Sequence, residues 1–257
     1  MTSTLERVRT RFAWQTRVGA VCVAVALVAI LVAMLPRLPQ PLAYHDFADQ
    51  RAFAGIPNFL DVVSNLAILL AGATGMRHWA RSTVAWRVFF VAAAGIGCGS
   101  AWYHWAPDNA RLLWDRLPMA LAFGALVAAV IGDRISARGG PLLLAPLMFG
   151  AAASVVLWYG SELAGAGDLR PYLFVQGGAA LAVALVLLLF AARHTHGGAV
   201  AVALGCYALA MICGEILDAR IYAGTGAVSG HTIKHLLAGA AIGQLARMIR
   251  LRAPLEQ

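Results

Sequence analysis

The hydrophobic residues of this chain come in blocks of about 20, the length that an α-helix needs to cross a lipid bilayer. Of 257 residues, 61% are hydrophobic and only 12% are charged, roughly half of the charged fraction in soluble domains. We therefore predict an all-α, polytopic membrane helix bundle. The basic residues lie in short loops between the blocks, so the net charge of +8 does not indicate nucleic-acid binding.

We expect a single integral-membrane domain over residues 1–257 with eight spans. The first span is expected at 18–35, after a basic N-terminal segment. A cleaved signal peptide is the alternative for this span, but the apolar run is long and no small-x-small cleavage site follows it. The remaining spans are expected at 59–76, 88–106, 113–132, 141–160, 171–192, 198–218 and 231–249.

The arginines predict the orientation of the chain, because basic residues concentrate on the cytoplasmic side of a membrane. With eight spans, one side receives both termini, the 77–87 loop, the 133–140 loop and most of the arginines. We therefore expect both termini in the cytoplasm. All basic residues except Lys234 are arginine, a bias typical of a GC-rich bacterial genome, which points to the bacterial inner membrane. The two sets of arginines are Arg7, Arg9, Arg11, Arg17, Arg77, Arg81, Arg87, Arg134, Arg138, Arg193, Arg247, Arg250 and Arg252 on the cytoplasmic side, and Arg37, Arg51, Arg111, Arg170 and Arg220 on the other.

Polar residues stand where one span ends and the next begins, in Gly99-Ser-Ala-Trp-Tyr-His-Trp-Ala-Pro107 and the following Trp-Asp-Arg-Leu-Pro. Such residues are costly close to the membrane interior, so they call for a functional explanation. Ser100 and His104 are four apart and share a helix face. Asp115 begins the next span and can fold back beside them. All three are expected near the periplasmic face.

A second polar group opens the last span, where His231 and His235 also lie four apart. They are about 40° apart around a helix, so both can reach one ion. Gly239 and Gly243 continue the same stripe, where we expect them to let another helix approach closely. Together with His104 they supply three imidazoles, the usual number of protein ligands at a catalytic zinc. Two alternatives remain for these residues. Lys234 could bind retinal as a Schiff base, but in the first turn of the span it can simply snorkel to the surface. Two histidines could hold a haem, but a haem leaves Ser100 and Asp115 unexplained.

Ser100-x-x-x-His104, Asp115 within Trp-Asp-Arg-Leu-Pro-Met, and the closing His231-x-x-x-His235 resemble the alkaline ceramidases. These are seven-helix membrane hydrolases in a wider group that includes the adiponectin-receptor-like proteins. The stretch 58–65 is similar to the family's segment entering its first helix, so the resemblance runs from about residue 46 to 235. It implies a seven-helix core over 46–249, to which the 18–35 span is an addition. It also implies that His104, His231 and His235 hold zinc, while Ser100 and Asp115 serve catalysis.

The acidic motif before the first core helix departs from the family. Animal ceramidases bind calcium there, and Asp46 and Asp49 resemble part of that motif. Arg51 stands where an asparagine ligand is expected, and Asn58 where a glutamate is. An arginine can supply a cation's charge itself, so activity is expected to depend little on calcium. If calcium binds, Asp46, Asp49 and Asn58 are the candidate ligands.

The resemblance implies zinc-dependent hydrolysis of the N-acyl amide bond of ceramide or a ceramide-like lipid, releasing a fatty acid and a sphingoid-type amine. The expected partners are the bilayer and a lipid substrate that enters laterally from it. The alternative is a lipid-sensing receptor or transporter with a structural zinc site. A fourth protein ligand in the position of the water would favour that alternative.

Overall fold

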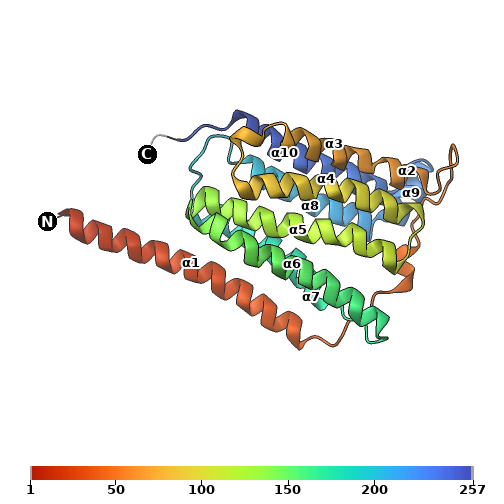
Figure 1. Cartoon of the computed structure of the whole chain (residues 1–257), viewed down its shortest axis with the longest axis horizontal. Coiled ribbons are helices and arrows are strands. Elements are labelled where there is room, and N and C mark those ends of the chain that lie inside the picture. The colour runs from red at the N-terminus through yellow and green to blue at the C-terminus, as the bar shows by residue number, and fades with distance from the viewer. Residues whose placement is uncertain (1, 256–257) are drawn as a thin grey trace.

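The protein is an up-and-down bundle of helices whose long axes run roughly parallel, with α1 along its outside (Figure 1). The structure is a computed structural model that describes residues 2–255, with side chains described from Phe12 onward. Within residues 2–255 there is no β-strand, only two isolated bridges. The predicted all-α class is therefore confirmed over the described chain.

The helical elements follow one another with short connections. The long ones are α1 (Thr2–Met34), α4 (Val84–Trp105), α5 (Asn109–Arg134), α6 (Gly139–Leu163), α7 (Arg170–Leu189), α8 (Ala199–Met211) and α10 (Gly230–Leu251). The shorter ones are η1 (Leu42–His45), α2 (Phe59–Val63), α3 (Asn65–Met76), η2 (Trp79–Arg81), the π-helix η3 (Ile212–Ile216) and α9 (Asp218–Thr225).

Seven helical segments among the described residues are long and apolar enough to cross a membrane. The predicted eighth span, 231–249, is the well-formed helix α10, but its histidines, Lys234 and later arginines leave it less apolar than the other seven. The count of eight spans stays a prediction, as does the role of α1 as an addition to a seven-helix core. The seven segments are Phe12–Met34, Phe59–Met76, Val84–Trp105, Asn109–Arg134, Gly139–Leu163, Arg170–Leu189 and Ala199–Ile216.

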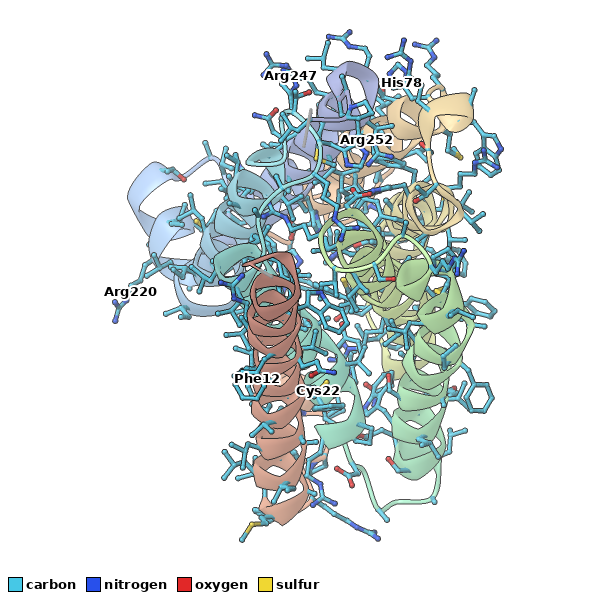
Figure 2. All side chains as sticks on the ribbon, turned by 90° about the vertical axis from the view of Figure 1, so that its left-hand side faces the viewer. Phe12, Cys22, His78, Arg220, Arg247 and Arg252 are labelled. Atoms are coloured by element: carbon cyan, nitrogen blue, oxygen red, sulfur yellow. The ribbon has the colours of Figure 1, made fainter. Side chains whose placement is uncertain are left out.

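The ends of the bundle differ in what they hold. The start of α1 and the end of α10 lie at one end, together with the loops that carry most of the arginines (Figures 1 and 2). Figure 2 looks from that end and labels His78, Arg247 and Arg252 there. The predicted site residues come from the opposite end, where α4 ends and α5 and α10 begin. The relative placement of termini and site thus agrees with the prediction, while the compartment that each end faces is not tested by it. The side chains of Arg7, Arg9 and Arg11, which contributed to that prediction, lie outside the described ones.

Two buried apolar clusters fill the bundle. The cluster at the arginine-rich end includes Trp86, Phe90 and Ile249, all at 0% exposure. The cluster nearer the site is richer in aromatic rings and includes Tyr103 and Trp158. Packing on both sides of the histidines therefore holds the ends of α4, α5 and α10 in place.

Candidate metal centre and its cavity

A sharp turn between α4 and α5 brings Ser100 and Asp115 face to face. Helix α4 ends at Trp105 because Pro107 forces the residue before it, Ala106, into an extended conformation. Asp108 then caps α5 by accepting a hydrogen bond from the Arg111 amide at 2.6 Å. The antiparallel return is very close: a Cβ on Gly99 would collide with the carbonyl group of Trp114.

The three predicted histidines meet inside the bundle. His104 comes from the last turn of α4, and His231 and His235 come from the first turns of α10. Their ring centroids form a nearly equilateral triangle with sides of 4.8, 4.8 and 4.9 Å. All three are buried, with exposed fractions of 1–5%. One nitrogen of each lies within 4.8 Å of the others, as a shared metal ion requires. Their predicted proximity is confirmed.

The nitrogen spacing fits a tetrahedral ion. The Nε2 atoms of His104 and His231 are 3.2 Å apart. Two ligands at about 2.0–2.1 Å from a tetrahedral zinc would be separated by roughly 3.3–3.4 Å. Three imidazoles also suit copper, iron and nickel. The cluster can therefore hold a metal ion, and its geometry does not select which one.

Hydrogen bonds fix the orientation of the rings. The Nδ1 atom of His235 lies 2.8 Å from the hydroxyl group of Ser64, which itself donates to the Asp61 carbonyl group. Such partners on the far nitrogen orient a ligating imidazole. The Nδ1 atom of His104 has no partner among the described residues.

A cavity of about 300 Å³ opens against the histidine cluster. The three histidines line it together with Ser100 and Asp115. Both are buried, at 3% and 6% exposure. Most of the remaining wall is apolar and comes from α4, α5, α7, α8 and α10, including Phe89, Leu126, Val183, Leu204 and Leu245.

Lys234 also reaches this cavity. Its ammonium group is 2.5 Å from a carboxylate oxygen of Glu215, which lies in the π-helix η3, and both side chains line the cavity. The side chain of Lys234 is 18% exposed and that of Glu215 is 30% exposed. The sequence analysis did not single out Glu215, because one acidic residue in an apolar run gives no spacing signal. A π-turn at this point is typical of functional sites.

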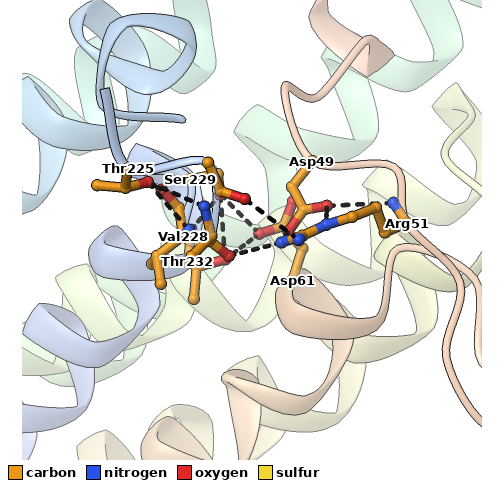
Figure 3. A network of polar contacts seen from close by, with 9 residues as sticks. Asp49, Arg51, Asp61, Thr225, Val228, Ser229 and Thr232 are labelled. Carbon is orange, nitrogen blue, oxygen red and sulfur yellow. Dashed lines mark hydrogen bonds and ion pairs between the residues drawn. The ribbon is translucent and has the colours of Figure 1, made fainter. Parts of the chain in front are cut away.

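A buried polar network fastens the start of α10 to α2 (Figure 3). The side chain of Asp61 is fully buried and accepts hydrogen bonds from Ser229 at 3.1 Å and Thr232 at 2.7 Å. Ser229 also caps α10 by accepting from the Thr232 amide. From α9, Asp218 accepts from the His231 amide at 2.7 Å. These contacts set the position of the two α10 ligands.

The predicted calcium residues have other partners. Arg51 donates to both carboxylate oxygens of Asp49 at 2.8 Å and to the carbonyl groups of Gly226 and Ala227. These hydrogen bonds from the Arg51 guanidinium hold the pKa of Asp49 below its usual value. Asn58, in a left-handed conformation that asparagine tolerates, donates to the His104 carbonyl group at 2.8 Å.

Asp46, the third predicted calcium residue, is exposed. The guanidinium group of Arg51 thus satisfies Asp49 with a positive charge, as the sequence suggested. Whether calcium binds at all stays untested.

Small residues allow α10 to approach α3, but only in part as expected. A Cβ on Gly239 would lie 2.8 Å from the Cβ of Ala67, so glycine is required there. Gly243, which the same stripe predicted to be a contact, has nothing within 4 Å. That prediction was wrong: the helices have diverged one turn further along.

Comparison of the sequence with models of known protein families, and with curated proteins, gives no match.

Proposed function

We propose that this protein is an integral-membrane zinc amidase that hydrolyses the N-acyl bond of a ceramide-like lipid, releasing a fatty acid and an amine. One observation carries the proposal: three buried imidazoles, a carboxyl group and a hydroxyl group converge on a largely apolar cavity inside the bundle. The polar wall suits an amide, and the apolar wall suits an acyl chain.

The metal centre supports hydrolysis because three protein ligands leave one coordination position free. When bound there, a zinc ion polarises an amide carbonyl and lowers the pKa of water towards neutrality. Neither Ser100 nor Asp115 belongs to the histidine cluster, so both remain available for chemistry. This arrangement favours an enzyme over a receptor with a closed structural site.

Asp115 acts as the proton shuttle in this proposal. It accepts a proton as the oxygen of water attacks the carbonyl carbon, and it returns a proton to the amine nitrogen as the carbon–nitrogen bond breaks. Ser100 donates a hydrogen bond to the negative charge that develops on the carbonyl oxygen. Both side chains are buried and line the same cavity.

The lipid enters from the bilayer, and its acyl chain lies among the apolar side chains of α4, α5, α7, α8 and α10. Both termini are placed in the cytoplasm, because most of the arginines lie at that end of the bundle. The metal centre then lies near the periplasmic face of a bacterial inner membrane.

The test is Asp115→Asn, which keeps shape and polarity but removes the basic carboxylate. Hydrolysis of a fluorescent acyl-amide lipid is expected to fall by about 10²–10⁴-fold, the range for a general acid–base group. Zinc content, measured by elemental analysis, should stay at one ion per chain. The matched control is Asp108→Asn, because this half-exposed carboxylate caps α5 and pairs with Arg111 but does not line the cavity.

Near-normal turnover by Asp115→Asn would remove Asp115 as the base. No amide cleavage by the parent protein, together with loss of zinc from Asp115→Asn, would instead favour a receptor with structural zinc.

A further inference from the structure

Arg116 is a buried cation in the wall of the same cavity. It follows Asp115 on α5 and is 3% exposed. Its guanidinium carbon lies 4.3 Å from the ring centroid of Trp158, 4.8 Å from that of Tyr172 and 5.3 Å from that of Tyr44. An aromatic cage of this kind orients a cation and partly offsets its loss of water.

The charge of Arg116 has no carboxylate partner among the described residues. Each ion pair found there involves a different arginine or Lys234. One nitrogen, Nη2, donates to the neutral side-chain oxygen of Gln40 at 2.6 Å, and Nη1 is buried with no hydrogen-bond partner. The nearby carboxylate of Glu162 instead accepts hydrogen bonds from the backbone N–H of Gln40 and from the indole N–H of Trp158.

A buried guanidinium group without a counter-ion is expensive, and proteins rarely retain one without a partner that arrives from outside. Arginine is also suited to carboxylates and phosphates, because its planar fork can donate two parallel hydrogen bonds. Gln40, Tyr44 and Tyr172 line the cavity beside Arg116. The cavity therefore has a polar region of its own, separate from its apolar wall.

We propose that Arg116 binds an anionic group, a carboxylate or a phosphate, on the amine side of the amide lipid. The preferred substrates are then acidic N-acyl amines, with the acyl chain in the apolar part of the cavity and the amide at the histidines. This inference rests on the proposed function for the hydrolysis step, but the binding of an acidic lipid can be measured without it.

The experiment compares three lipids of equal chain length on the full-length protein: N-lauroylglycine, neutral N-lauroylethanolamine and the phosphate ester of the latter. Thermal stabilisation measures binding, and release of the amine measures hydrolysis. We expect the two acidic lipids to exceed the neutral one by about 10- to 100-fold in affinity or in kcat/KM, the change for a hydrogen bond to a charged group. Arg116→Gln should bring that ratio close to one, and Arg116→Lys should restore it in part.

The matched control is Arg111→Gln, on the same helix, where the arginine pairs with Asp108; the acidic-to-neutral ratio should be unchanged. If Arg116 has only a structural role, Arg116→Gln should reduce the binding and hydrolysis of all three lipids to the same extent. Equal binding of acidic and neutral lipids by the parent protein overturns the proposal even if Arg116→Gln fails to fold.

Inorganic phosphate serves as a further probe. Stabilisation by phosphate equal to that by N-lauroylglycine would assign Arg116 to a free anion and overturn the substrate assignment. Binding of acidic lipids that depends on Arg116, without release of any amine, would support this subsite while refuting the amidase.

Discussion

Helices α1 and α10 are opposites. Residues 12–34 of α1 have the highest mean hydropathy of the seven apolar segments, 2.5, and none of its most apolar stretch is buried. Helix α10 is not apolar enough to join those segments, yet half of its residues are buried, including His231 and His235. Figure 1 shows α1 along the outside of the bundle. In this protein, the helix with the highest mean hydropathy lies on the outside of the bundle, whereas a less apolar helix is half buried and carries two of the clustered histidines.

The difference has a physical cause. A side chain that faces lipid must be apolar, whereas one that faces the bundle can be polar if its hydrogen bonds are made. The first turns of α10 meet that condition through Asp61, Asp218 and Glu215. From Phe12 onward, the side chains of α1 have no such partners in other helices. The helix packs along α7, and Arg170 donates to the Ala33 and Leu35 carbonyl groups near its end.

The largest expected effect comes from removing the two histidine side chains of α10. The double variant His231→Ala, His235→Ala leaves only one of three metal ligands, so zinc binding and amide hydrolysis should both fall to background. Elemental analysis and lipid hydrolysis check this. The control is His78→Ala with His196→Ala, which lie outside the histidine cluster. Full zinc occupancy in the α10 variant would place the metal elsewhere.

A matched pair of isoleucines tests packing directly. Ile249 in α10 is 0% exposed and Ile30 in α1 is 55% exposed. Ile249→Ala should lower the free energy of unfolding by about 2–5 kcal/mol, because it leaves a cavity in packed surroundings. Ile30→Ala should change it by less than about 0.5 kcal/mol. Unfolding in mixed micelles measures the free energy of unfolding of both variants. Equal decreases would contradict the difference in packing between α10 and α1.

Two glycines sharpen the contrast within α10. Gly239→Ala places a Cβ 2.8 Å from that of Ala67 on α3, whereas Gly243→Ala meets nothing within 4 Å. Gly239→Ala should therefore destabilise the protein by about 1–3 kcal/mol through overpacking. Gly243→Ala should be neutral or slightly stabilising, because alanine favours the helix. Thermal unfolding of both variants is the measurement, and similar melting temperatures would contradict the packing described for Gly239.

These examples show how far the sequence leads. The bundle and the histidine cluster were predictable because each rests on a short-range pattern, a run of apolar residues or a spacing of four. The partners Asp61, Ser64, Asp218 and Glu215 were not assigned roles, because each is defined by a contact with a distant helix. Gly243 was misassigned for a related reason: a stripe shows which residues share a face, but not where a neighbouring helix diverges.

The smallest expected effect lies in the segment between α1 and α2, where Arg51 pairs with Asp49 and also contacts Ala227, shortly before α10. The pKa of Asp49 is lowered in the folded protein by Arg51, so its contribution to stability is complete above the unfolded value of about 3.9. It is lost as the pH falls through the folded pKa. The difference in melting temperature between the parent and Asp49→Asn should be constant from pH 7 to about 5 and shrink below about 4. A difference that grows on acidification would contradict the ion pair.

The contacts around the metal centre have a consequence for synthesis. They join residues 48–104 to residues 218–235: Ala48 to Asp218, Arg51 to Gly226 and Ala227, Asp61 to Ser229 and Thr232, and His104 to the two α10 histidines. A ribosome makes the chain from its N-terminus, so His104 is synthesised well before α10, which carries His231 and His235. No shortened chain that ends before α10 can assemble the histidine cluster, so any function that depends on this cluster requires α10 to have been made.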